Sequence, residues 1–95
     1  MKLYEWDSQK NSKLKEEREI SFEDIVFYLE RNDVLDIVPH PNKEKYPNQK
    51  IFVVEIDEYV YLVPFVEEGN SIFLKTIIPS RKATKRYAGR PHETR

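Results

Sequence analysis

The hydrophobic residues near the start of this chain repeat at the spacing of an α-helix. The apolar side chains that share one helical face are Phe22, Ile25, Val26 and Leu29. Ser21 is followed three residues later by Asp24, a capping-box arrangement with Asp in place of the usual Glu. Ile20 and Ile25 stand at the two positions of a hydrophobic staple. The pattern predicts a helix over residues 22–31.

The segment before this helix is more polar. Residues 3–6 contain closely spaced large apolar side chains and can begin a strand. Asp7 or Ser8 then suits the N-cap of a helix over residues 8–19. Leu14 is the only large apolar residue in that stretch. We therefore expect this helix to be weak unless tertiary contacts hold it.

Short apolar runs separated by turn residues fill the second half of the chain. Residues 34–39 predict a short strand that ends at prolines, and residues 42–50 predict a polar loop. Three further strands are expected at residues 51–56, 59–66 and 71–78. Pro64 lies inside the middle run, and because proline lacks a ladder N–H, it implies a bulge or an unpaired edge position. The pattern predicts an antiparallel meander.

The last predicted element is a short basic helix over residues 81–88, capped by Ser80. Its cations are Arg81, Lys82, Lys85 and Arg86, which fall within an arc of about 140° at helical spacing. The other side carries Ala83, Thr84, Tyr87 and Ala88. The geometry predicts one basic stripe, backed by a small face that can dock on the rest of the domain.

These elements define a small α+β domain. We expect residues 1–88 to form a single domain and residues 89–95 to form a loose tail. The chain has no cysteine, which excludes disulfides and thiolate metal ligands and fits a cytoplasmic location. Its two histidines, His40 and His92, lie far apart, so a structural zinc site is not expected. The sequence gives no sign of a membrane span or a cofactor.

Charge is unevenly distributed along the chain. Residues 1–80 hold 10 basic and 16 acidic residues, a balance of -6, whereas residues 81–95 hold 6 basic and 1 acidic, a balance of +5. Such asymmetry marks either a segment that meets a polyanion or an acidic partner, or a solvated helix that aids solubility. Cations in the first turn oppose the helix dipole, which slightly favours an anion-binding role.

Three short motifs resemble a known family. They are YEWD at 4–7, ISFED at 20–24 and PSRKAT at 79–84, in an order and spacing similar to those of BrnT-type toxins of bacterial toxin–antitoxin pairs. The resemblance spans about residues 4–87. It implies a RelE-like fold, with two N-terminal helices packed on a curved antiparallel sheet, and a metal-independent endoribonuclease that arrests growth. It also implies a cognate antitoxin of the ribbon-helix-helix class, with operator DNA bound only through the toxin–antitoxin complex.

RNA cleavage through the 2′-hydroxyl needs a base, an acid and cations that stabilise the phosphate. The candidate catalytic residues are Lys75, Arg81, His40, Glu55 and Lys50. His40 can serve as acid or base near neutral pH, or it is an exposed loop histidine. Glu55 is a candidate base or a cross-strand partner of a lysine. Lys50, Lys75 and Arg81 are candidates for the phosphate.

Further residues are candidates for binding RNA rather than for cleaving it. They are Lys82, Lys85, Arg86, Tyr46, Lys45 and Tyr87. Tyr46 and Tyr87 can stack on unpaired bases, as can Tyr59 and Tyr61, or the rings belong to the core.

Two other functions remain open from the sequence. One is a non-catalytic protein of the same fold that binds an antitoxin or an operator DNA complex. The net negative charge of residues 1–80 favours this function, because RNA-binding surfaces are usually basic. The other is a generic small α+β interaction domain.

Overall fold

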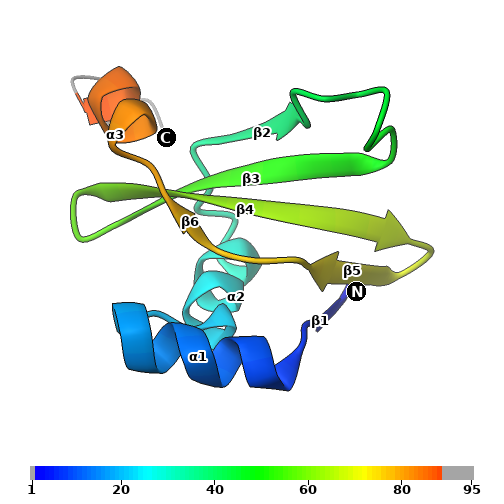
Figure 1. Cartoon of the computed structure of the whole chain (residues 1–95), viewed down its shortest axis with the longest axis horizontal. Helices are drawn as coiled ribbons and strands as arrows, with labels where there is room; N and C mark the ends of the chain where they lie inside the picture. Colours follow the sequence, from blue (N-terminus) through cyan, green and yellow to red (C-terminus); the bar gives the residue numbers. More distant parts are fainter. Residues whose placement is uncertain (1, 89–95) are drawn as a thin grey trace.

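Three helices and a six-stranded sheet form residues 2–88, the part of the chain that the computed structural model describes (Figure 1). The helices are α1 (Ser8–Arg18), α2 (Phe22–Glu30) and α3 (Arg81–Ala88). The strands are β1 (Leu3–Glu5), β2 (Asp36–Pro39), β3 (Gln49–Ile56), β4 (Tyr59–Glu68), β5 (Ser71–Leu74) and β6 (Ile78–Pro79). The predicted α+β class is confirmed. The predicted tail at 89–95 lies outside the described residues.

The sheet is mixed rather than purely antiparallel, which corrects the prediction. The strand order is β1-β5-β4-β3-β2, and β6 also pairs with β4. The N-terminal strand β1 runs parallel to β5, while the other pairs are antiparallel. The sequence patterns of β3, β4 and β5 indicate hairpins between neighbours, but they carry no signal for the long-range pairing of β1.

The strand expected at residues 71–78 is divided into β5 and β6. Pro64 explains where the division falls. The carbonyl of Pro64 accepts a hydrogen bond from the Lys75 N–H (2.8 Å), so this carbonyl faces the β5–β6 side of β4. Because N and O of a strand residue point the same way, the missing N–H of Pro64 faces that side too. Pro64 therefore sits in a central strand, paired with Ile51 on one side and facing the gap between β5 and β6 on the other.

Helix α1 has two buried residues, the expected Leu14 and the polar Asn11, which the sequence did not single out. Its N-cap is Asp7, whose carboxylate accepts hydrogen bonds from the backbone N–H groups of Gln9 (2.8 Å) and Lys10 (3.0 Å). Leu14 enters the core. The Asn11 side chain is 6% exposed and its Oδ1 accepts a hydrogen bond from the Phe22 N–H at 2.8 Å. Tertiary contacts thus fix a helix whose own sequence favours it little.

Helix α2 begins at the predicted cap. The Ser21 hydroxyl accepts a hydrogen bond from the Asp24 N–H (3.1 Å), and the Asp24 carboxylate accepts one from the Ser21 N–H (3.0 Å). Both arms of the capping box are therefore present. Phe22 and Ile25 are fully buried on the face that meets the sheet.

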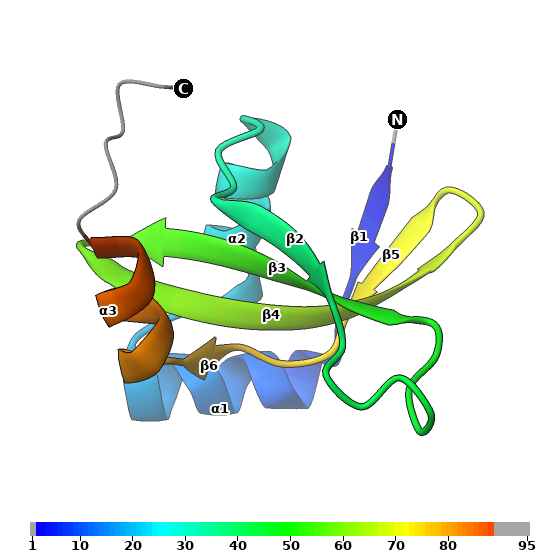
Figure 2. The same ribbon diagram turned by 90° about the horizontal axis from the view of Figure 1, so that it is seen from above.

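The two faces of the sheet are covered differently. Helices α1 and α2 lie together on one face (Figure 1), where the main core forms around Phe52, Val63 and Leu74. Helix α3 lies on the opposite face, over one end of β3 and β4 (Figure 2). We call this second face the open face. No helix in the described part of the chain is long and apolar enough to cross a membrane.

Candidate functional site

The strand registers define which residues share the open face. Residues directly paired across strands point to the same side of a sheet. One row across β2–β3–β4–β6 is Asp36, Val53, Leu62 and Ile78, and the next is Val38, Ile51 and Pro64. The third row is His40, Gln49, Val66 and Phe73, because the His40 N–H donates to the Gln49 carbonyl (3.2 Å) just beyond the end of β2. Helix α3 covers the first of these rows and leaves the third uncovered by any described helix.

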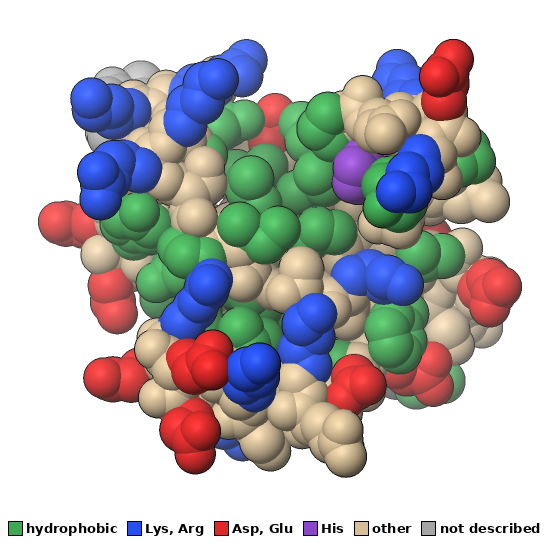
Figure 3. Space-filling view, in the orientation of Figure 1, with side chains coloured by type: hydrophobic (Ala, Val, Ile, Leu, Met, Phe, Trp, Pro, Cys, Tyr) green, Lys and Arg blue, Asp and Glu red, His purple; other side chains and the backbone are tan. Residues whose placement is uncertain are grey.

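A groove of about 430 Å³ runs between α3 and β2 on the open face. Its floor is made by Val38, Ile51, Val53 and Leu62, and its β2 side by Pro39 and Pro41. On the other side Lys82 and Arg86 line it. Figure 3 shows this apolar surface between the cluster of basic side chains over α3 and the histidine on the far side. Ile51 and Val53 are only 7% and 2% exposed, so the accessible apolar surface of the groove comes from its other lining residues, among them the partly exposed Val38 and Leu62.

Two hydrogen bonds attach the start of α3 to the start of β4, and two more fix the first turn of α3. The Ser80 N–H donates to the Val60 carbonyl (3.0 Å), and the Val60 N–H donates back to Thr84 Oγ1 (2.9 Å). Thr84 Oγ1 donates to the Ser80 carbonyl (2.7 Å), and Ser80 Oγ caps the helix by accepting from the Ala83 N–H (3.0 Å). We call this set the α3 clamp. It turns the docking face of α3 inward.

The basic stripe of α3, formed by Arg81, Lys82, Lys85 and Arg86, is exposed as predicted. Ala83, Thr84 and Tyr87 face the sheet. Lys82 and Arg86 line the groove, whereas Arg81 and Lys85 are not among its lining residues. Between residues 2 and 88 the ion pairs are Lys2–Glu67 and Lys15–Glu23, and neither involves the stripe. The stripe therefore has no carboxylate partner within the described residues.

Tyr87 serves the attachment of α3 to the sheet. Its ring is 8% exposed and packs against Val53 and Val60. Its hydroxyl donates to Asp36 Oδ2 at 3.3 Å, which links α3 to β2 at the end of the groove. A ring held in this way has little face to offer to a base. The structure thus favours packing, one of the two alternatives that the sequence left open for Tyr87.

His40, Lys45 and Tyr46 come together at the other side of the open face. The rings of His40 and Tyr46 have centroids 4.5 Å apart, and Lys45 Nζ lies 5.5 Å from the Tyr46 centroid. The Asn42 N–H donates to His40 Nδ1 (3.0 Å), so the neutral ring carries its proton on Nε2. The Asn42 side chain in turn accepts from the Lys45 N–H (3.2 Å). We call this group the loop corner.

Lys75 lies at the β5 side of the open face. Its N–H bonds to Pro64, and its Nζ lies 5.7 Å from the centroid of the Phe73 ring. Phe73 is 38% exposed, which is unusual for an aromatic residue on a strand. Sequence reasoning selected Lys75 as a strand-interrupting cation but missed Phe73. The alternation in residues 71–75 carries the missed signal, because Ile72 and Leu74 are buried and Phe73 takes the opposite side.

Glu55 is separated from the loop corner. It faces the same side of the sheet as Ile51 and Val53, but it stands six residues along β3 from Gln49, the neighbour of His40. At about 3.4 Å per residue the separation is about 20 Å. Glu55 and His40 therefore do not meet at one phosphate group.

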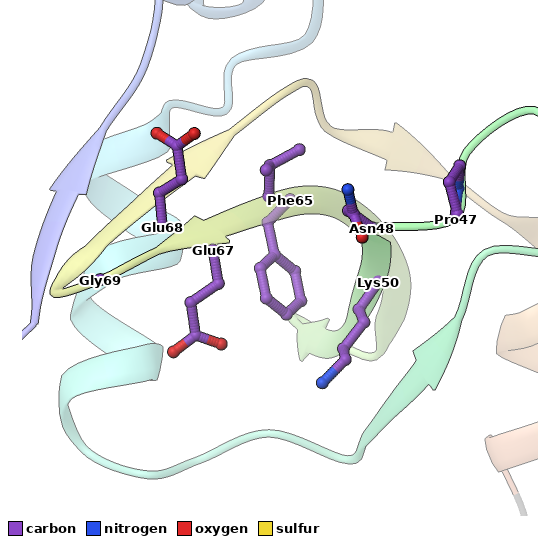
Figure 4. A pocket seen from close by; sticks show the side chains of 8 residues that line it. Pro47, Asn48, Lys50, Phe65, Glu67, Glu68 and Gly69 are labelled. Carbon is purple, nitrogen blue, oxygen red and sulfur yellow. The ribbon is translucent and has the colours of Figure 1, made fainter.

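Lys50 points away from the open face. It lines a separate hollow of about 470 Å³ that also includes Phe65 and Glu67 (Figure 4). Phe65 belongs to the core on the α1–α2 side, so the hollow lies on that side of the sheet. Of the five candidate catalytic residues, His40 and Lys75 border the open face near its uncovered row, and Arg81 is on the stripe. Glu55 lies far along β3 from His40, and Lys50 points to the other side of the sheet.

The displaced pKa values lie on the α1–α2 side. A hydrogen bond from Asn11 lowers the pKa of Glu23, and the contact with Lys2 lowers the pKa of Glu67. Burial raises the pKa of Tyr4 and of Tyr61, both of which pack against the main core. The described residues contain no cluster of three His, Asp or Glu side chains that could hold a metal ion.

Asp36 is a second residue that sequence reasoning missed. It lines the groove and holds the Tyr87 hydroxyl, while its other oxygen accepts from the Ile37 N–H (2.8 Å). Nothing in the local sequence distinguishes it from an ordinary surface Asp at a strand start. Only the docking of α3 gives it a role.

No family model, curated protein or solved structure matches this chain. The resemblance to BrnT-type toxins therefore rests on its three sequence motifs, and the RelE-like identity of the fold stays a prediction. Each motif also has a structural role here. Trp6 stacks on Phe22 (5.7 Å), Ser21 and Asp24 form the capping box, and Ser80 and Thr84 form the α3 clamp.

Proposed function

We propose that this chain binds RNA along the groove of its open face and acts as the RNA-cleaving toxin of a bacterial toxin–antitoxin pair. The observation that carries the proposal is the basic stripe, four exposed cations that meet no carboxylate within residues 2–88. Two of the four, Lys82 and Arg86, border a groove that is open along the face of a sheet. Cations arranged along a groove are typical of surfaces that bind the phosphate backbone of a nucleic acid.

The energetics of α3 support an anionic ligand. Arg81 and Lys82 occupy the first turn, where the helix dipole disfavours positive charge, and the first turn contains no acid. The pairs Arg81–Lys85 and Lys82–Arg86 also repel each other at i,i+4 spacing. Phosphate groups along the stripe relieve both effects, because cations and the N-terminal end of α3 then face negative charge. Lys85 and Arg86 lie in the last turn, where the dipole favours cations, so the charges that stability alone does not explain are Arg81 and Lys82.

The cleavage step is supported by fewer residues than the binding step. His40 presents Nε2–H as a donor, while its Nδ1 already accepts from Asn42. In this neutral form His40 can donate a hydrogen bond from Nε2–H to a phosphate or leaving oxygen, whereas general-acid catalysis would need the imidazolium, which loses the bond from the Asn42 N–H. Lys82 and Arg86 supply positive charge at the groove, and Lys75 lies on the same face three strands from His40, where it can meet a different phosphate. The base is unassigned, since Glu55 lies about 20 Å from the loop corner.

The test uses two double variants of equal charge change. Lys82→Ala/Arg86→Ala removes the two cations of the groove, and Lys10→Ala/Lys13→Ala removes two exposed cations from α1. We expect the groove variant to bind single-stranded RNA about tenfold more weakly at low salt, with the control unchanged. The negative slope of log affinity against log salt concentration should become shallower by about 1.4 when two phosphate contacts are lost. Equal effects of the two variants would refute binding at the groove.

Toxicity and cleavage are measured with the same variants. Induction of the wild-type chain is expected to arrest growth, with relief by a neighbouring ribbon-helix-helix gene, and purified protein is expected to cut RNA in the presence of EDTA. Growth arrest by the groove variant at normal expression would remove the assigned site. RNA binding without cleavage would leave a binding protein and refute the enzyme.

A second function, the non-catalytic protein that binds an antitoxin, is favoured by the apolar lining of the groove. Val38 and Leu62 are partly exposed there. The deeper floor residues Ile51 and Val53 are buried, however, and the exposed cations Lys82 and Arg86 line the groove. This positive charge is why RNA is the first choice. Complex formation that survives Lys82→Ala/Arg86→Ala but is lost in Leu62→Asp would favour the second function.

A further inference from the structure

The open face carries two cation–aromatic pairs at opposite sides. At the loop corner, Lys45 lies over Tyr46, and Tyr46 contacts His40. At the β5 side, Lys75 lies over Phe73. Both pairs sit at the row His40–Gln49–Val66–Phe73, which no described helix covers. The sheet thus places Phe73 and Lys75 on this surface, and the loop after β2 places Tyr46 and Lys45 beside it through the contact of Tyr46 with His40.

The distance between the pairs follows from the sheet. His40 continues β2 and Phe73 lies on β5, and β3 and β4 run between them. Three strand spacings of about 4.8 Å separate His40 from Phe73 by about 14 Å, and the Tyr46 ring lies against His40 with centroids 4.5 Å apart. Bases stacked as in a duplex are about 3.4 Å apart along one strand, so this separation corresponds to about four nucleotide steps, or fewer in a splayed strand.

We infer that Phe73 and Tyr46 are two stacking platforms for the bases of an unpaired RNA strand, with Lys75 and Lys45 turning to its phosphates. The inference rests on the proposed RNA binding and narrows it to single-stranded RNA of about five nucleotides. Phe73 alternates with the buried Ile72 and Leu74 and is 38% exposed on the open face, where a base can reach its ring beside the Lys75 ammonium. A base of any sequence can stack on such a ring, because every base has a π-face.

The inference distinguishes single strands from duplexes. In a duplex the bases are stacked on one another, and an A-form helix presents its phosphates and 2′-hydroxyls rather than base faces. The separated rings of Phe73 and Tyr46 therefore add no affinity for a duplex. The basic stripe alone would bind both forms.

The experiment measures the affinity of the full chain for fluorescent RNA oligonucleotides of 2–8 nucleotides and for a 12-base-pair RNA duplex. The variants are Phe73→Leu, which keeps apolar bulk without a ring, and Phe73→Trp, which keeps a ring. Phe27→Ala is the matched control, because Phe27 is an exposed phenylalanine of α2 beneath the Arg31 guanidinium (5.0 Å), away from the open face. We expect affinity to rise with length and to level off near five nucleotides.

Phe73→Leu is expected to weaken single-strand binding about tenfold, whereas Phe73→Trp and Phe27→Ala retain it. Unchanged binding in Phe73→Leu, together with loss in Lys82→Ala/Arg86→Ala, would overturn the platforms and leave the groove intact. Equal affinity for duplex and single strand would also overturn the platforms. Absence of RNA binding by the wild-type chain, with or without binding of a protein partner, would refute the proposed function itself.

Discussion

The two faces of the sheet are both apolar in sequence, yet they are organised in different ways. On β3, Phe52 and Val54 point to α1 and α2, and Ile51 and Val53 point to the open face. The first pair joins a core of interlocked side chains from helices and strands. The second pair forms the floor of a groove beside α3. Hydrogen bonds and the Tyr87 side chain attach α3 to the sheet there. A large hydrophobic core secures the fold on one side, and on the other a small apolar cluster around Val53, Val60 and Tyr87 together with hydrogen bonds holds α3 and its exposed charge.

The largest expected difference between the faces comes from two adjacent residues of β5. Leu74 is fully buried against α1 and α2, and Phe73 is 38% exposed on the open face. Leu74→Ala is expected to lower the free energy of unfolding by about 2–5 kcal/mol, because it removes buried methyl groups and leaves a cavity. Phe73→Ala is expected to cost less than about 1 kcal/mol. Urea denaturation followed by circular dichroism measures both values.

Equal losses in these two variants would contradict the division into a packed face and an open face. Leu3→Ala is a suitable reference for the assay, since Leu3 is 59% exposed on the edge strand β1. It is expected to remain within about 0.5 kcal/mol of the wild type.

A smaller loss is expected from Asn11, the polar residue within the packed side. Its Oδ1 accepts from the Phe22 N–H and its Nδ2 donates to Glu23 Oε1, each at 2.8 Å, which joins α1 to the start of α2. Asn11→Ala leaves the Phe22 N–H without its acceptor, and we expect a loss of about 1–3 kcal/mol in the free energy of unfolding. Ser12→Ala, at an exposed position of α1, is the matched control. If the two variants are equally stable, the coupling of the helices through Asn11 is wrong.

Local sequence signals predicted those parts of the fold whose partners are close in the chain. The capping box at Ser21 and the cap at Ser80 were readable because each involves residues three apart. The parallel pairing of β1 with β5 was not, since its partners lie about seventy residues apart and parallel pairing leaves no turn motif between them.

The candidate site was predicted in the same uneven way. The basic stripe followed from helical spacing alone, and the docking of Ala83 and Thr84 behind it is observed. Lys50 and Glu55 were grouped with His40 because of charge and strand position. A one-residue step along β3 reverses the face, and six residues span about 20 Å, so neither residue reaches the loop corner.

The α3 clamp gives a prediction on the open side. Thr84→Val keeps the shape of the side chain but removes the acceptor for the Val60 N–H. We expect a loss of about 1 kcal/mol and faster hydrogen exchange at Val60 and throughout α3, while Phe22 and the α2 amides remain protected. Thr84→Ser keeps the hydroxyl and is expected to restore slow exchange. If hydrogen exchange became faster to the same extent in α2 and α3, α3 would not open independently of the rest of the fold.

The smallest expected effect is a pH dependence confined to the packed side. The hydrogen bond from Asn11 lowers the pKa of Glu23 below its ordinary value of 4.5. A carboxyl whose pKa is lower in the folded state than in the unfolded state stabilises the fold above the unfolded value, and this contribution is lost as pH falls through the folded value. Stability is therefore expected to decline below about pH 4.5.

The decline should be shallower in Glu23→Gln, because glutamine accepts the same hydrogen bond without titrating. The control is Glu55→Gln, on the opposite face of the sheet, which should retain the part of the wild-type decline that depends on Glu23. Parallel wild-type and Glu23→Gln curves from thermal unfolding between pH 3 and pH 6 would remove Glu23 from this role and leave Asn11 with its bond to Phe22 alone.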